Sequence, residues 1–138
     1  MIDPEFGALR WNPDLEWWEG SVKLVSAKPF TLYIFARETV DGRVSEEARR
    51  AFRTLAQFET ECRRYAASEL LEIQNQEWAE GKEISESEFV ERLIPDSVEI
   101  HESGYMEFHF HDDDLFWGHG VGVRVQPDGK FQEAVVEG

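Results

Sequence analysis

The chain has 138 residues, 41% of them hydrophobic, and a formal net charge of −15. Such a chain can bury one core, which excludes an intrinsically disordered protein despite the high charge. A single cysteine, Cys62, excludes an intrachain disulfide framework, and no apolar run approaches the ~20 residues that cross a bilayer. Residues 1–6 resemble expression-vector residues. We therefore expect one cytoplasmic domain over residues 7–138.

The negative charge is concentrated in the later part of the sequence. From Glu83 onward there are 14 acidic and 3 basic residues, whereas residues 1–82 contain 15 and 11. This excess repels nucleic-acid phosphates and anionic lipids, and it speeds the encounter with a basic protein. The same charge also serves solubility alone. We expect a basic protein partner, and neither nucleic acid nor a membrane.

Two strands are predicted in the first third of the chain. Residues 15–26 alternate apolar side chains such as Trp18 with polar ones, which is the period of a strand. Residues 30–37 are rich in β-branched and aromatic types and place Leu32 and Ile34 on one face. The two strands are expected to pair as a hairpin.

A long helical pattern follows. Ser45 is placed as an N-cap with two glutamates after it, and apolar residues then recur near a 3.6 period as far as Glu80, before Gly81. A helix of this length exceeds the width of the domain, so we expect a kink or split between Gln57 and Cys62. The arginines should form a solvated face. Two surface ion pairs are expected, Glu46 with Arg50 and Glu59 with Arg63.

The remaining elements complete an α+β fold. Ser85 and Glu88 have capping-box spacing, which predicts a short helix over residues 86–93 before Pro95. Period-two patterns then predict strands at residues 97–101, 106–111, 121–125 and 131–136. We predict an antiparallel sheet of about five or six strands, with one long (kinked or split) helix and one short helix packed on one face.

His109 and His111 form an H-x-H pair on one predicted strand, so both imidazoles point to one side of the sheet. Such a pair can chelate a metal if a carboxylate and a third ligand close the site, and Asp113 or His119 could do so. The pair could also act as a pH-sensitive contact surface. No motif of metal-binding spacing supports the first alternative, so we expect no metal and no cofactor.

Ordinary cross-strand pairing is the other interpretation of these histidines. It follows if the apolar residues Ile100 and Phe108 lie opposite each other in the sheet. The charged residues between them then form complementary pairs on the solvated face, as oppositely charged neighbours do in stable sheets. The expected pairs are Glu99 with His109 and Glu107 with His101.

His119 is two residues before Val121, so in a strand its side chain would lie on the same face as Val121. This places the ring of His119 on the core side or at the margin of the core. A histidine there needs hydrogen-bond partners, and one of residues 112–114 is the expected partner. A catalytic role would require a nucleophile nearby. Cys62 lies on an apolar helix stripe, where thiols are usually inert. We therefore assign no catalytic residue.

The three aspartates have none of the ligand spacing of a calcium loop. They are followed directly by Leu115, Phe116 and Trp117, so charge and aromatic area lie together, as in contact loops. A merely solvated turn is the alternative. The candidate partner-binding residues are Asp112, Asp113, Asp114, Phe116, Trp117, His119, His109 and His111.

The segment Asp112–His119, with Asp128-Gly129 and Gly138 after it, resembles an uncharacterised bacterial family, a domain of unknown function with a D-D-L-F-W-G-H motif. Tyr65 to Trp78 and Phe89 to Leu93 resemble the helical half of the same family. The resemblance covers residues 15–138 and implies a compact bacterial cytoplasmic protein. It implies no activity.

Three functions remain open. The first is a non-enzymatic protein-binding module. By analogy of size and charge, such a module could be an immunity-type inhibitor that neutralises a basic toxin. The second is a metal-dependent or His/Asp-based enzyme that uses His109, His111, His119 and one aspartate. The third is a structural or regulatory subunit whose interface is the exposed aromatic residues.

Overall fold

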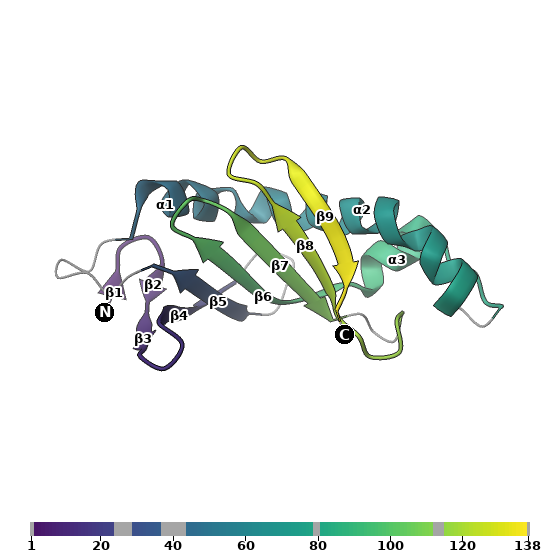
Figure 1. Cartoon of the computed structure of the whole chain (residues 1–138), viewed down its shortest axis with the longest axis horizontal. Helices are drawn as coiled ribbons and strands as arrows, with labels where there is room; N and C mark the ends of the chain where they lie inside the picture. The colour runs from purple at the N-terminus through teal and green to yellow at the C-terminus, as the bar shows by residue number, and fades with distance from the viewer. Residues whose placement is uncertain (1, 24–28, 37–43, 79–80, 112–114, 138) are drawn as a thin grey trace.

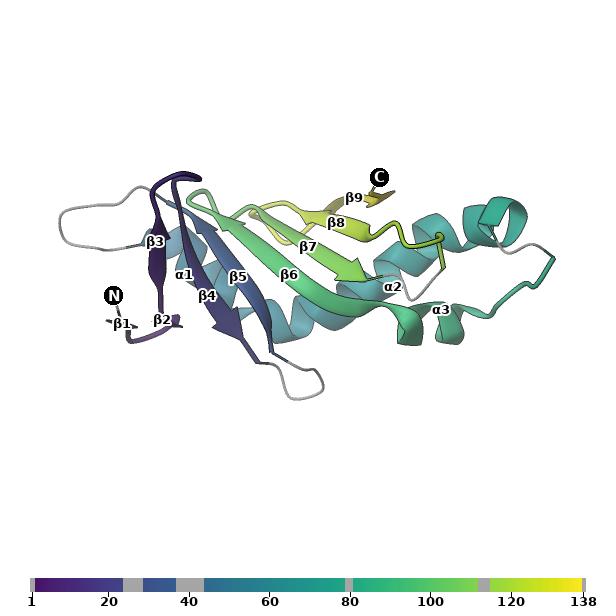
Figure 2. The same cartoon turned by 90° about the horizontal axis from the view of Figure 1, so that it is seen from below.

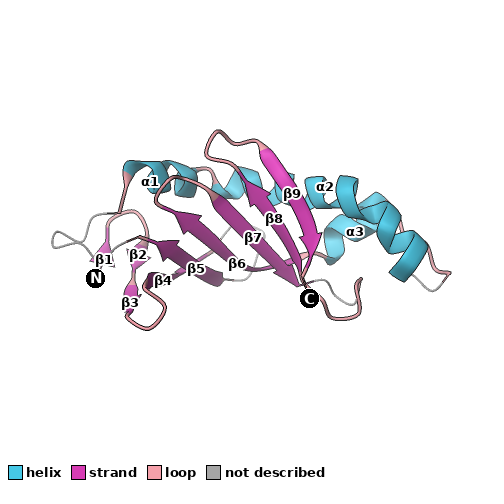
Figure 3. Cartoon of the chain, viewed as in Figure 1, coloured by secondary structure: helices cyan, strands magenta, loops and turns pink. Residues whose placement is uncertain are grey.

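The protein is an α+β fold in which helices cover one face of a sheet (Figures 1 and 3). The structure, a computed structural model, describes residues 2–23, 29–36, 44–78, 81–111 and 115–137, and of Ala56 only the backbone. Within these residues the main sheet has seven strands in the order β3-β4-β5-β6-β7-β8-β9. Those strands are β3 (Arg10–Asn12), β4 (Trp17–Val22), β5 (Phe30–Phe35), β6 (Ile94–His101), β7 (Met106–His111), β8 (Val121–Val125) and β9 (Phe131–Val136).

The α+β class and the helix-covered sheet are confirmed, but the main sheet has seven described strands rather than the expected five or six, and it is not wholly antiparallel. All neighbours in the sheet are antiparallel except β5 and β6, which are parallel. The segment between these two strands holds every helix that the structure describes. Because this long crossover carries the chain back along the sheet, β6 can enter in the same direction as β5.

The long helical segment is split, but at Thr54 rather than between Gln57 and Cys62. At the split the Thr54 hydroxyl donates to the carbonyl oxygen of Ala51 at 2.7 Å, and the Thr54 N–H donates to the same oxygen at 3.1 Å. A threonine that bonds back to the preceding turn competes with the regular helix. The helical elements are α1 (Glu46–Arg53), α2 (Leu55–Ile73), the π-helical turn η1 (Gln74–Trp78) and α3 (Glu86–Arg92).

The core lies between the helices and one face of the sheet. Alternate residues of the strands are buried there, as the period-two patterns predict; they include Leu32, Ile34, Val98, Ile100, Phe108, Phe110, Val121, Val123 and Val125. On the helix side Cys62 is fully buried, and this burial raises the pKa of its thiol well above the usual range. The thiol is therefore protonated and shielded, which agrees with an inert cysteine.

The register between β6 and β7 differs from the expected one by two residues. Ile100 lies opposite Met106 and Val98 opposite Phe108. The turn is tighter than the expected one: the N–H of His101 donates to the carbonyl of Tyr105, and Gly104 adopts a φ of 93°. The expected pairs therefore do not lie opposite each other. Glu99 faces Glu107 directly, His109 faces Ser97, and the ring of His101 stacks on Phe35.

Residues near the N-terminus take part in the fold. A two-stranded sheet joins β1 (Ile2–Asp3) to β2 (Gly7–Ala8), and Phe6 and Leu9 are buried in the core. The vector origin of residues 1–6 stays a prediction.

The arginines of the helices are only partly a solvated face. Arg49 is mostly buried and pairs with Asp3. Glu46 pairs with Arg53 rather than with Arg50. The expected pair of Glu59 and Arg63 is present, but Glu59 is buried rather than on the surface. Among the described residues no helix is both long and apolar enough to cross a membrane.

The N-caps predicted for α1 and α3 are confirmed. The Ser45 hydroxyl accepts from the N–H of Ala48 at 3.2 Å, and the Ser85 hydroxyl accepts from the N–H of Glu88 at 3.1 Å.

We expect Ser85→Ala to lower the free energy of unfolding by about 1 kcal/mol, because it leaves the N–H of Glu88 unpaired. Urea denaturation of both variants would check this. Ser87→Ala, within the same helix, should be neutral or slightly stabilising because alanine favours helices; equal losses in the two variants would contradict the cap.

Candidate functional site

The sheet face opposite the helices carries polar side chains that point away from the core. Figures 1 and 2 show α1 and α2 together on the other side of the strands. Glu99 on β6 and Glu107 on β7 are register partners on this outer face. Two carboxylates directly opposite each other repel, so the pair requires positive charge nearby.

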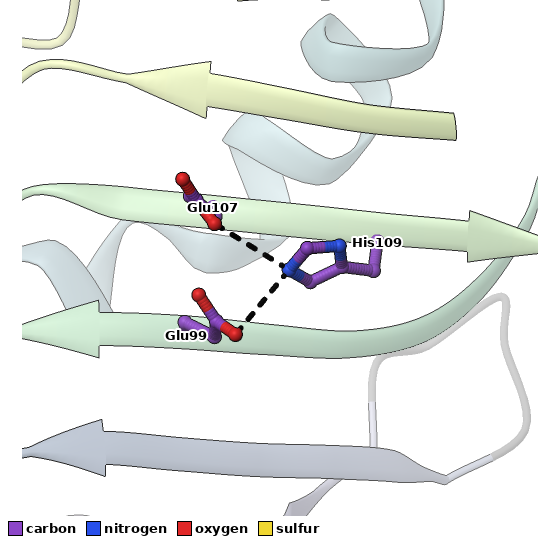
Figure 4. Close-up of side chains that lie close together, drawn as sticks. All are labelled: Glu99, Glu107 and His109. Carbon is purple, nitrogen blue, oxygen red and sulfur yellow. Dashed lines mark ion pairs between the residues drawn. The ribbon is translucent and has the colours of Figure 1, made fainter. Parts of the chain in front are cut away.

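His109, together with Arg124, supplies that charge. Its Nε2 lies 3.5 Å from Oε1 of Glu99 and 3.6 Å from Oε2 of Glu107, and Figure 4 shows the ring aimed between the two carboxylates. Its Nδ1 lies 2.7 Å from Oε1 of Glu137, which is a hydrogen-bond distance. The two contacts of Nε2 are longer than hydrogen bonds, and the buried Nε2 has no hydrogen-bond partner among the residues that the structure describes. One ring nitrogen is therefore anchored, and the other faces the acidic pair.

The anchor from Glu137 depends on a glycine. Gly122 on β8 lies opposite His109 in the sheet, and β8 separates His109 from the end of β9. A Cβ added at Gly122 would lie 2.7 Å from Oε1 of Glu137, closer than real contacts allow. The bare backbone of Gly122 therefore leaves the space through which Glu137 reaches His109.

Glu107 is held by its other oxygen. Oε1 accepts from the Tyr105 hydroxyl at 2.9 Å and lies 3.0 Å from Nε of Arg124, which also pairs with Glu133. These contacts leave Oε2 directed at His109. Burial, and then the hydrogen bond to Glu107, raise the pKa of Tyr105 to about 12.

Glu137 and Glu99 determine the charge state of His109. The hydrogen bond to Glu137, and next the contact with Glu99, raise the pKa of His109 to about 10. The contact with His109 in turn lowers the pKa of Glu99. At neutral pH, without any other cation, His109 is an imidazolium that balances part of the surrounding negative charge.

The other histidines lie elsewhere. His111 is exposed, and its Nε2 pairs with Oδ1 of Asp96 at 2.9 Å. The structure thus does not join the predicted H-x-H pair in one site. His119 is exposed rather than buried, and its ring centroid lies 5.9 Å from that of Trp78, so it lies at the margin of the core. The expected partner of His119 and the candidate residues Asp112, Asp113 and Asp114 lie outside the described residues.

The loop after β7 is anchored by aromatic packing. Phe116 is fully buried and packs edge-on against Trp78 and Phe89. Trp117 is 59% exposed, yet its Nε1 donates to the carbonyl oxygen of Trp78 at 3.1 Å and its ring packs edge-on against that of Trp78. Trp117 also has a φ of 56°, a left-handed conformation that costs a non-glycine residue about 1 to 3 kcal/mol. The fold holds an exposed indole in place.

A family match covers nearly the whole chain. A sequence model of the family described as "Uncharacterized protein conserved in bacteria (DUF2262)" matches residues 3–136. The chain belongs to this family. The expected resemblance to an uncharacterised bacterial family is therefore confirmed, over a longer range than residues 15–138. The search of curated proteins and the search of solved structures each gave no match.

In this DUF2262 chain, sequence reasoning missed several residues that the fold brings together. Glu137 follows the last strand and reaches His109 across β8, and Trp78 supports both Phe116 and Trp117. Glu107, the expected partner of His101, instead contacts the side chain of His109 on its own strand. The sequence pattern that points to Glu107 is the period-two alternation of its strand: Glu107 and His109 alternate with buried residues, so both side chains lie on the outer face. No local signal points to Glu137 or Trp78.

Proposed function

We propose that this DUF2262 protein is a non-enzymatic protein-binding module, an immunity-type inhibitor that neutralises a basic partner such as a bacterial toxin in the cytoplasm. The observation that carries the proposal is that the side chain of Trp117 is exposed and yet held in place. An exposed indole that is held by a hydrogen bond and by ring packing loses little entropy when a partner covers it. Tryptophan is also the residue type most enriched at the energetic centres of interfaces.

The charge around Trp117 supports a basic partner. Figure 1 shows α3, the end of α2 and the segment after β7 at the same end of the molecule. Between residues 69 and 92 the sequence has eight glutamates but only Lys82 and Arg92 as basic residues. An aromatic anchor within an acidic surround suits a cationic surface, which the field would steer toward it.

The test is co-expression with each protein encoded beside the gene in its source bacterium. We expect one basic neighbour that stops growth alone, forms a stoichiometric complex with this protein and no longer stops growth in its presence. Trp117→Ala should weaken the complex by about 2 kcal/mol or more, roughly 30-fold in Kd, because it removes the anchor. Isothermal titration calorimetry at two salt concentrations would measure this loss.

Leu15→Ala is the matched control, because Leu15 is 54% exposed in the turn between β3 and β4, near the opposite edge of the sheet. It should leave the affinity unchanged. A search in which no neighbour forms a complex or is neutralised would refute the proposal. Full affinity in the Trp117→Ala variant would reject this surface as the interface.

A metal-dependent or histidine-based enzyme is the second candidate, and the cluster around His109 is the observation that favours it. Its residues differ from the expected His109, His111 and His119 set, because Glu99 and Glu107 flank His109. Turnover of simple phosphodiesters or esters by the zinc-supplemented protein, lost in His109→Gln, would favour the enzyme over the binding module.

A further inference from the structure

Three side chains on the outer sheet face present metal-binding atoms to one point. Nε2 of His109 and one carboxylate oxygen each of Glu99 and Glu107 lie within 4.8 Å of one another. In Figure 4 the three side chains converge from two adjacent strands. A rigid sheet positions ligands more accurately than loops do.

The distances fit a metal better than they fit hydrogen bonds. Ligands of a tetrahedral zinc ion, with bonds of ~2.0 to 2.2 Å, lie roughly 3.3 to 3.6 Å apart. Nε2 of His109 lies 3.5 Å from the Glu99 oxygen and 3.6 Å from the Glu107 oxygen. At these separations the buried Nε2 has no hydrogen-bond partner within the described part of the chain. A cation between the three atoms would satisfy all of them.

The surrounding contacts are those that orient metal ligands in proteins. A histidine ligand usually donates from its second nitrogen to a carboxylate, which fixes the tautomer and the direction of the ring. Glu137 does this at Nδ1 of His109, at 2.7 Å. Tyr105 and Arg124 likewise hold Oε1 of Glu107 and leave Oε2 for the site.

We propose that Glu99, Glu107 and His109 bind one divalent metal ion, with zinc as the favoured occupant, and that Glu137 orients the histidine. The mixed nitrogen and oxygen donors suit zinc, which binds such sites more tightly than manganese or iron(II) does. A divalent cation would also offset the repulsion between the two facing glutamates. Trp117 packs on Trp78 of the helical segment, whereas the site lies on the sheet face opposite the helices, so the site is independent of the proposed partner.

The experiment is calorimetric titration of the untagged full chain with zinc sulfate after removal of metal by a chelator. We expect one saturable site. Glu99→Gln and His109→Gln should each weaken zinc binding at least tenfold, because each removes a ligand. Glu137→Gln should weaken it roughly 10- to 100-fold, as the loss of an orienting partner does. Circular dichroism of each variant would check that the fold is kept. Glu99→Gln removes one of two facing like charges, so a loss of zinc binding in this variant is not expected to come from a loss of the fold.

His111→Gln is the matched control, because His111 is an exposed histidine on the same strand that is two residues from His109. It should bind zinc as the unaltered protein does, since His111 contributes no ligand. The proposal is overturned if the unaltered protein has no saturable site, if Glu99→Gln and His109→Gln bind normally, or if His111→Gln abolishes binding. None of these outcomes depends on whether Trp117 binds a partner.

Discussion

Phe116→Ala is expected to lower the free energy of unfolding by about 3 to 5 kcal/mol, the loss typical of a buried phenylalanine. Phe116 has no exposed surface and packs against Trp78 and Phe89. Its removal would leave a cavity between the loop after β7, the turn η1 and helix α3. Urea denaturation followed by tryptophan fluorescence and by circular dichroism would measure the loss.

Trp117→Ala is the matched control for this prediction. The two residues are neighbours in the chain, but Trp117 is 59% exposed and fills no cavity. It should cost much less stability than Phe116→Ala, since its ring packing and its hydrogen bond to Trp78 are only partly shielded from water. Equal losses in the two variants would mean that the loop is not anchored through Phe116. The contrast also separates a folding defect from a binding defect at this end of the molecule.

Asp3→Asn is expected to lower the free energy of unfolding by about 3 kcal/mol, because it leaves a mostly buried arginine without its main counter-charge. Arg49 donates to both oxygens of Asp3, at 2.9 and 2.7 Å, and the N–H groups of Glu5 and Phe6 donate to the same carboxylate. The Asp3 side chain is 4% exposed. Glu5, 3.3 Å from Arg49, keeps part of the compensation, which places the loss at the lower end of the usual range.

The loss should depend on pH. The Arg49 guanidinium holds the pKa of Asp3 well below its usual range in the folded state. The ion pair therefore contributes its full stability above the unfolded pKa of ~3.9 and loses it as the pH falls below that value. The difference between the unaltered protein and Asp3→Asn should be constant near pH 7 and shrink below about pH 4. Denaturation at several pH values would check this.

Asp14→Asn provides the control for charge alone. Asp14 is exposed in the turn between β3 and β4, and the free energy of unfolding should change by no more than about 0.5 kcal/mol. A loss in Asp3→Asn that matched the one in Asp14→Asn would show that the pair with Arg49 contributes nothing. A loss that persisted unchanged in acid would contradict the assigned cause.

Local sequence patterns predicted most of the helices and strands, because each pattern depends only on residues that are close together in the chain. The strand β7 follows from the alternation of Met106, Phe108 and Phe110 with polar residues, and the start of α3 follows from Ser85. The split of the long helix was expected but misplaced, since a threonine that bonds to the preceding turn is a weaker signal than proline or glycine.

The cluster of Glu99, Glu107 and His109 could be predicted only in part. Parity placed His109, Glu107 and Glu99 on the outer face, which is where they lie. Their register could not be read from the pattern, because a shift of two residues keeps every apolar side chain in the core. The tight turn with Gly104 decided that Glu99 faces Glu107 instead of His109.

By itself the sequence determined the fold class, the position of most strands and helices, the two helix caps and the concentration of acidic charge, because these follow from the order of neighbouring residues. Only the tertiary structure decided the parallel entry of β6, the burial of Asp3 with Arg49, and the meeting of Trp78 with Trp117 and of Glu137 with His109. Each of these contacts joins residues at least 28 positions apart, so it depends on strand order and register rather than on any local pattern.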